Sequence, residues 1–339
     1  MSRVFVFGAG ASTEYRSVTQ LPVPIDSTFW GTLEVILERT QQPPKFTESE
    51  RLDLGYLRQF LLDRYRVKTL RELNENGLET VFENIYENTP EKIPHFQRLL
   101  EWTLFWIIRK IDKGSAPAHY SFVWSKIQPG DGIITFNYDI ILDQILWELA
   151  LEKSSPIKWH PSTGYGITFK GYLDQLLPSQ AEQFKTLAPA ASNIYIYKLH
   201  GSLGWFQLQA QGGALCLYLS GKPEKGRLAT KGYLSGQLLL VPPIPDKDFF
   251  TEPLLRVWEQ AEMALNKAEK VYFIGYRFPH ADGRALRLFE RTCKNKDAEV
   301  VLKLTGPGSK EDWKRIANIL PRLTPSSRQN RTFSNWLEL

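Results

Sequence analysis

The stretch VFVFGAGAS, from Val4 to Ser12, is the strongest local feature of the sequence. Its first four residues are apolar and predict a strand that is buried on both faces, as in a parallel sheet. Glycines directly after such a strand permit a tight turn and let the backbone approach a pyrophosphate, which N–H groups at a following helix start would hold. Thr13 stands where the third glycine of a dinucleotide-binding fingerprint would be. A nucleotide-binding turn and a plain tight turn are both open here.

Further short apolar runs end in glycine or a polar residue and alternate with amphipathic segments. The runs are Gly132 to Phe136, Ile194 to Leu199, Leu238 to Val241, Val271 to Ile274 and Val300 to Leu304. The segments with helical spacing are Ile140 to Leu151, Leu254 to Leu265, Ala285 to Cys293 and Lys310 to Leu320. This alternation predicts an α/β fold with a Rossmann-like, doubly wound, mainly parallel sheet.

The chain has 339 residues, which leaves room for one large domain with insertions or for two domains. Residues 45–114 show helical periodicity and no strand signal, so we expect a helical insertion there. The predicted nucleotide-binding domain then covers residues 1–44 and 115–321, and residues 322–339 form a polar, basic tail. Within the predicted nucleotide-binding domain, two short runs on either side of Gly212 and Gly213 predict a hairpin.

The cysteine and histidine content excludes several kinds of site. Only Cys216 and Cys293 are present, so the chain has neither a disulfide framework nor a zinc site of four thiolates. Three histidines, His95, His119 and His160, have no metal-ligand spacing and are interpreted as structural. We expect no metal.

The remaining composition points to a folded protein that acts in the cytoplasm. Hydrophobic residues make up 42% and charged residues 23% of the chain, near globular norms. The first residues lack the pattern of a signal peptide, and the apolar run from Leu99 to Ile108 contains Glu101 and is too short to span a membrane. A net charge of +5, spread along the chain, permits nucleic-acid binding without indicating it.

The second motif is TFNYD, from Thr135 to Asp139, at the end of a predicted strand. Polar groups at the carboxyl end of a parallel strand lie over the ligand crevice of such a sheet, which makes Asn137 and Asp139 candidate site residues. The alternative is that they simply cap the helix that follows.

The third and fourth motifs also end apolar strands. KLHGS places His200 and Gly201 at a strand end, where a histidine accepts a proton near neutral pH or bonds a ribose hydroxyl; a purely structural histidine is the alternative. GYRFPHAD contains Gly275 and Tyr276, and its Asp282 either caps a helix or binds a ribose.

The order GAGAS, TFNYD, KLHGS and GYRFPHAD resembles the sirtuins, and most closely the sirtuin-like proteins of bacterial antiphage defence systems. The stretch LETVFENI, from Leu78 to Ile85, is similar to the acidic and aromatic stretch in the helical insertion of those proteins. The resemblance extends over about residues 3 to 305.

This resemblance implies a residue-by-residue assignment of an NAD site. Asn137, Asp139 and His200 would be the catalytic residues, and His200 would be the catalytic histidine. Residues that would contact NAD are Gly8, Ala9, Gly10, Ser12, Thr135, Gly201, Gly275, Tyr276 and Asp282. Three features depart from the deacylases of the family: no zinc ribbon, Arg277 in place of the usual serine, and no recognisable arginine-bearing cofactor loop.

The implied activity is hydrolysis of NAD to nicotinamide and ADP-ribose, without a metal, in an effector that depletes NAD during abortive infection. Because unrestrained hydrolysis would poison the host, the resemblance also implies a switch: a homo-oligomer, or a separate sensor such as a HerA-type ATPase or helicase or an Argonaute-type protein. Two alternatives remain, a zinc-free NAD-dependent deacylase and a non-catalytic subunit that senses NAD or ADP-ribose. A dehydrogenase is disfavoured by Thr13.

Overall fold

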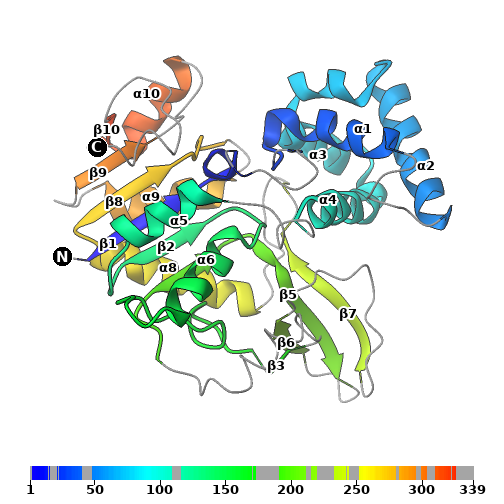
Figure 1. Cartoon of the computed structure of the whole chain (residues 1–339). Helices are drawn as coiled ribbons and strands as arrows, with labels where there is room; N and C mark the ends of the chain where they lie inside the picture. Colours follow the sequence, from blue (N-terminus) through cyan, green and yellow to red (C-terminus); the bar gives the residue numbers. More distant parts are fainter. Residues whose placement is uncertain are drawn as a thin grey trace. The chain divides into compact units, whose positions relative to one another are not determined.

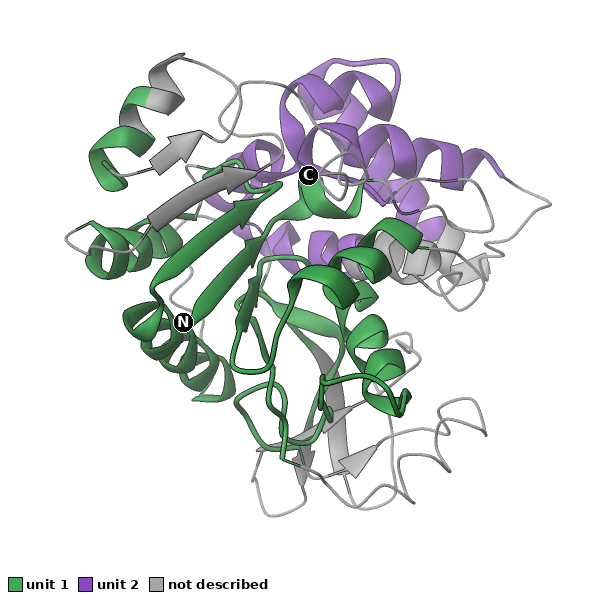
Figure 2. Ribbon diagram, turned by 60° about the vertical axis from the view of Figure 1, so that its left-hand side comes forward, with its two compact units in different colours: residues 1–14, 116–241, 247–339 green, residues 15–115, 242–246 purple. Residues whose placement is uncertain are grey.

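The computed structural model describes residues 2–13, 15, 21, 23–39, 48–108, 116–169, 171–172, 191–210, 215–219, 233–241, 243, 252–279, 282–294, 299–303, 310–321 and 323–325. The chain divides into two compact units (Figure 2). We call residues 1–14, 116–241 and 247–339 the sheet unit, and residues 15–115 and 242–246 the helical unit.

A six-stranded sheet forms the centre of the sheet unit (Figure 1). Its strands are β1 (Arg3–Phe7), β2 (Gly132–Thr135), β4 (Tyr195–Lys198), β8 (Lys270–Ile274), β9 (Glu299–Lys303) and β10 (Leu323–Pro325). The order is β10-β9-β8-β1-β2-β4, and every pair of neighbours is parallel. The chain runs outward from β1 through β2 to β4 and then returns to β8 on the other side of β1. This is the strand order of a dinucleotide-binding sheet, and its switch point lies between β1 and β8. The predicted fold class is confirmed.

Helices cover both faces of this sheet. They are α5 (Pro117–Lys126), α6 (Ile141–Leu151), α8 (Glu252–Lys267), α9 (Gly283–Cys293) and α10 (Lys310–Ile319). Phe5 and Phe7 contact the ring of Phe122 on α5 at centroid distances of 5.7 and 5.8 Å. On the opposite face, a Cβ at Gly132 would lie 3.7 Å from Ala264 of α8. Alternate residues of the buried strands therefore pack against different helices, which explains why these runs are apolar throughout.

A second, four-stranded sheet has the order β3-β6-β5-β7. Its strands are β3 (Gly171–Tyr172), β5 (Gly201–Ala210), β6 (Leu215–Leu219) and β7 (Tyr233–Leu240). The predicted hairpin is confirmed, because β5 and β6 are antiparallel. The expectation that the run from Leu238 to Val241 belongs to the parallel sheet is wrong. Residues 238–240 end β7, which pairs antiparallel with β5, and an apolar run alone does not reveal its partner strand.

The helical unit contains α1 (Phe29–Glu38), α2 (Glu48–Tyr65), α3 (Gly77–Asn88) and α4 (Ile93–Ile108). It begins at Tyr15, whereas the sequence analysis placed its start at residue 45. The difference is α1, whose Trp30 is buried and donates from Nε1 to the carbonyl of Gly77 at 3.2 Å. Of the expected tail, residues 323–325 form β10, and residues 326–339 lie outside the described part of the chain. No helix within the described residues is long and apolar enough to cross a membrane.

Candidate active site at the carboxyl edge of the parallel sheet

The four motifs follow four neighbouring strands, β8, β1, β2 and β4. Because these strands are parallel and in register, their carboxyl ends meet at one edge. This is the edge at which open α/β sheets bind ligands, next to the switch point between β1 and β8. The structure therefore gathers the sequence motifs where a ligand site is expected.

The turns after β1 and β8 pack directly on each other. The N–H of Gly10 donates to the carbonyl of Gly275 at 3.0 Å. A Cβ at Gly8 would lie 2.6 Å from the carbonyl oxygen of Gly275, and a Cβ at Gly275 would lie 2.3 Å from the nitrogen of Ala11. Gly275 also has a φ of +61°, a conformation that favours glycine. Both glycines are explained by this backbone contact.

The residues at the tip of the first turn face outward. After Gly8 the chain forms a short 3₁₀ turn, Ala9–Ser12, in which Ala9 is exposed and Gly10 is partly exposed. His119, on α5, supports this turn, because its Nε2 lies 2.6 Å from the carbonyl oxygen of Ala11. A carbonyl only accepts, so Nε2 carries the proton. The sequence analysis took His119 as structural, without a link to the first motif.

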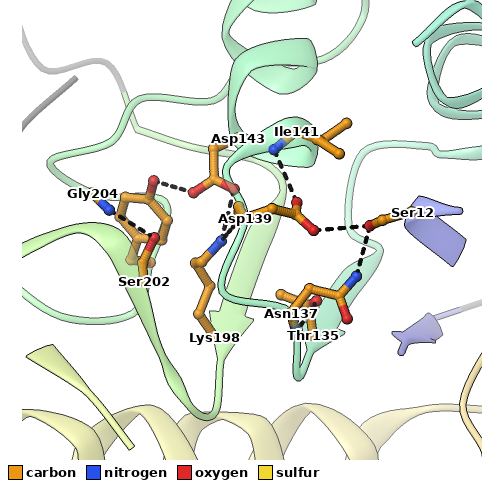
Figure 3. A network of polar contacts seen from close by, with 10 residues as sticks. Ser12, Thr135, Asn137, Asp139, Ile141, Asp143, Lys198, Ser202 and Gly204 are labelled. Carbon is orange, nitrogen blue, oxygen red and sulfur yellow. Dashed lines mark hydrogen bonds and ion pairs between the residues drawn. The ribbon is translucent and has the colours of Figure 1, made fainter. Parts of the chain in front are cut away.

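Asn137 lies in a buried polar network (Figure 3). Its Nδ2 donates to the carbonyl of Gly8 at 3.1 Å and to Oγ of Ser12 at 2.9 Å. Ser12 in turn donates to Oδ2 of Asp139 at 2.8 Å. The amide orientation is fixed by chemistry, because the carbonyl of Gly8 requires a donor.

The other end of this amide has no hydrogen-bond partner within the described part of the chain. Oδ1 of Asn137 is buried, and no described residue donates a hydrogen bond to it. In Figure 3 this oxygen points away from Ser12. A buried acceptor without a donor costs roughly 1–3 kcal/mol, so proteins retain one where a ligand, water or catalytic role supplies the reason.

Asp139 bonds both to the start of α6 and to Ser12 of the first turn. Its Oδ1 accepts from the N–H of Ile141 at 3.1 Å, which caps the start of α6, while its Oδ2 holds Ser12. Thr135 accepts the N–H of Asn137 on its Oγ1 at 3.1 Å. These contacts fix the loop between β2 and α6 from within.

His200 forms a second polar group with Asp282 and Tyr276. Its Nε2 lies 3.3 Å from Oδ1 of Asp282, and the hydroxyl of Tyr276 donates to Oδ2 of Asp282 at 3.0 Å. Asp282 stands at the N-cap position of α9, yet its side chain makes no cap hydrogen bond there. Of the two roles expected for Asp282, capping is therefore not observed; its carboxylate faces His200.

Aromatic packing links His200 to the loop that carries Asn137. The ring of Phe136 lies edge-on to His200, with centroids 5.2 Å apart, and is stacked on Tyr276 at 4.4 Å. Tyr276, which the sequence analysis expects to contact NAD, is 3% exposed. Gly201 has a φ of +78°, and a Cβ there would lie 1.9 Å from the carbonyl oxygen of Leu239.

Sequence reasoning missed an ion pair beside these residues. Nζ of Lys198, the last residue of β4, lies 3.0 Å from Oδ2 of Asp143, and it also donates to the carbonyl of Asp139. Asp143 also accepts a hydrogen bond from the hydroxyl of Tyr165. The available signals were a lysine at the end of an apolar strand and an acidic residue four positions after Asp139.

Two of the resolved pKa shifts belong to buried residues outside the contacts described above, His160 and Tyr197. Burial lowers the pKa of His160, whose Nδ1 lies 2.5 Å from Oγ of Ser162. Burial raises the pKa of Tyr197 to about 12, and the charge of Tyr195 contributes to this rise as the second cause. Among the described residues, no group of three or more His, Cys, Asp or Glu side chains is placed to hold a metal ion.

No protein-family model and no curated protein sequence matches this chain. Among solved structures, a mutant of a Sir2 homologue in complex with ADP-ribose is similar over 99% of this chain and 89% of its own, with 14% identity and a TM-score of 0.42. A complex of a Sir2 homologue with NAD is similar over 99% and 88%, with 12% identity and a TM-score of 0.43. Likeness this low does not place the chain in that family.

Proposed function

We propose that the chain binds NAD at the carboxyl edge of the sheet unit and hydrolyses the bond between nicotinamide and ribose. The observation that carries this proposal is the buried Oδ1 of Asn137, which no described residue satisfies. It lies beside the switch point of a sheet with dinucleotide-binding strand order, where such a ligand is expected.

The chemistry needs few groups. Nicotinamide leaves as a neutral molecule from a cationic ring, so no acid has to protonate it, unlike the leaving group of an ordinary glycoside. Water attacks C1′ of the ribose, the bond from C1′ to the ring nitrogen breaks, and its electron pair neutralises the ring. The protein must position the water and accept its proton.

Two residues suit these tasks. Oδ1 of Asn137 accepts a hydrogen bond from the attacking water, and His200 accepts the proton directly or through a ribose hydroxyl. Asp282, 3.3 Å from Nε2 of His200, stabilises the imidazolium that results. The nucleotide itself would be held by the outward residues Ala9 and Gly10 of the first turn.

The test is nicotinamide release by the purified chain, supplied with NAD alone and with the proteins encoded beside it. Asn137→Ala and His200→Ala should each lower the rate by about 10²- to 10⁴-fold while the fold is retained. Asn193→Ala is the matched control, because both ends of the Asn193 amide are already bonded, to the N–H of Lys158 and the carbonyl of Pro156. Full activity of either site variant refutes the assignment.

The same assay separates the alternatives. A zinc-free deacylase consumes NAD only when an acylated peptide is present, and a sensor binds NAD or ADP-ribose without turnover. Absence of binding to both nucleotides in calorimetry would refute all three functions.

We further propose that the activity serves antiphage defence by depleting NAD in the cytoplasm. Such an enzyme requires a switch, either a homo-oligomer or a separate activator, with HerA-type ATPases or helicases and Argonaute-type proteins as precedents. Light scattering at several concentrations counts subunits, and a strict monomer that is equally active at every concentration contradicts control by oligomerisation.

A further inference from the structure

We propose that Lys198 is a positioning residue, which holds the loop carrying Asn137 against the strand that leads to His200. The inference rests on the proposed function, because it assigns these two residues to one reaction. Nζ of Lys198 bonds to the backbone of Asp139 and to Asp143, so it acts on Asn137 through the loop backbone.

The side chain of Lys198 is almost fully buried, with 1% exposed. A buried ammonium group is costly unless it is paired and hydrogen-bonded. Here Nζ has both kinds of partner, the carboxylate of Asp143 at 3.0 Å and the carbonyl of Asp139. The hydroxyl of Tyr165 donates to the second oxygen of Asp143, so the carboxylate is also fixed. Figure 3 shows the ammonium group between Asp139 and Asp143.

The contact with Asp139 matters because of where that residue lies. Residues 136–140 connect β2 to α6 outside regular secondary structure. At one end of this loop, Thr135 holds the N–H of Asn137. At the other end, Lys198 holds the carbonyl of Asp139, whose side chain fixes Ser12. The loop therefore has a fixed path on both sides of Asn137.

Lys198 is also two positions before His200 in the chain. Lys198 is the last residue of β4, and its register partner is Thr135, the last residue of β2. One ammonium group thus ties together the ends of the two strands that precede Asn137 and His200. Misplacing a reacting group by about 1 Å costs roughly 10²-fold in rate, so such a tie is expected to influence catalysis.

If the ion pair of Lys198 and Asp143 were purely structural, replacing both residues would leave catalysis unchanged. Replacing a buried ion pair by apolar residues of similar volume is often neutral for stability. The test is therefore the double variant Lys198→Met with Asp143→Leu, which leaves no unpaired buried charge. Its matched control is Arg3→Met with Asp131→Leu. That pair joins Arg3 to Oδ2 of Asp131 at 2.6 Å, close to the amino ends of β1 and β2 and away from the site.

Two measurements are made on each variant of the whole 339-residue chain. The first is steady-state NAD hydrolysis, in which the Lys198 double variant should lose about 10- to 100-fold in kcat with KM changed less than about twofold. The second is hydrogen exchange of the amides of Asn137 and Ile141, which should speed up by about tenfold or more in that variant and not in the control.

The exchange experiment decides the role of Lys198 even if the chain shows no NAD hydrolysis. Unchanged exchange in residues 136–141 of the folded double variant overturns it, and so does an equal loss of kcat in the control. If the wild-type chain shows no NAD hydrolysis under any condition, the proposed function fails, while the exchange experiment still decides whether Lys198 positions the loop. The single variant Lys198→Met is not suitable, because it strands the carboxylate of Asp143.

Discussion

The turns after β1 and β8 contact each other through backbone atoms, whereas the loops after β2 and β4 are joined by polar side chains. Gly8 and Gly275 lie so close that neither place has room for a Cβ. Asn137, Asp139 and Lys198, in contrast, form a network of hydrogen bonds. Both regions lie at the same edge of one sheet.

Packing explains why Gly8 and Gly275 are glycines, but it does not explain the amide oxygen of Asn137. The glycines satisfy the backbone geometry of the β1 and β8 turns whether or not a ligand binds. Oδ1 of Asn137, however, has no donor among the described residues. Substitution of these glycines should therefore affect stability, and substitution of the polar side chains at this edge should affect activity.

The largest effect is expected from Gly275→Ala. Its φ of +61° is strained for alanine, and the new Cβ would lie 2.3 Å from the nitrogen of Ala11. Strain of this kind costs on the order of 1–3 kcal/mol, and the overlap adds to it, so we expect a total loss above about 4 kcal/mol or failure to fold. Urea denaturation measures the free energy of unfolding.

Gly130→Ala is the control for this prediction. Gly130 has a φ of +92°, also in the left-handed region, but a Cβ there would meet nothing within 4 Å. We expect it to lose only the conformational part, about 1 kcal/mol. Equal losses at the two positions would show that the contact between the turns contributes nothing.

A smaller effect, on activity alone, is expected from Asp282→Asn. The amide keeps the shape of the carboxylate and removes the charge that faces Nε2 of His200 at 3.3 Å. We expect kcat for NAD to fall by about 10- to 100-fold, since a positioned base contributes roughly 10²- to 10⁴-fold in total. Thermal denaturation should show a folded protein.

Tyr276→Phe should affect the same group more weakly than Asp282→Asn. It removes only the hydroxyl that donates to Oδ2 of Asp282 at 3.0 Å. Its kcat should fall by less than about fivefold, because the carboxylate that faces His200 remains. A normal kcat in the Asp282→Asn variant would show that Asp282 has only a structural role, as the acceptor for the hydroxyl of Tyr276.

The sequence predicted the parallel sheet because both faces of its strands are buried, which makes runs such as the one from Val4 to Phe7 apolar throughout. It also predicted which motifs meet, since the carboxyl ends of parallel strands share an edge. It did not predict the partner of the strand ending at Leu240, or the place of α1, because both depend on contacts between distant segments. For the same reason, nothing in the local pattern around Lys198 indicates that its ammonium group reaches Asp139.

The smallest effect is expected from His160→Asn, which tests whether burial of a polar side chain is sufficient for a functional role. His160 is buried, and Asn can replace its Nδ1 as the acceptor of the N–H of Ser162, which lies at 3.2 Å. Burial lowers the pKa of His160 in the folded chain. Well above pH about 6.5, His160 is neutral in both states and contributes nothing to the pH dependence.

As the pH falls through about 6.5, the unfolded chain binds a proton that folded His160 resists, so the free energy of unfolding decreases until the lowered pKa is passed. His160→Asn should remove this part of the slope between pH about 7 and 5 and leave NAD hydrolysis at pH 7.5 unchanged. Urea denaturation at several pH values compares the two proteins. An unchanged slope contradicts the role of burial at His160. A loss of hydrolysis as large as that of His200→Ala would mean that function extends beyond the edge where Asn137 lies.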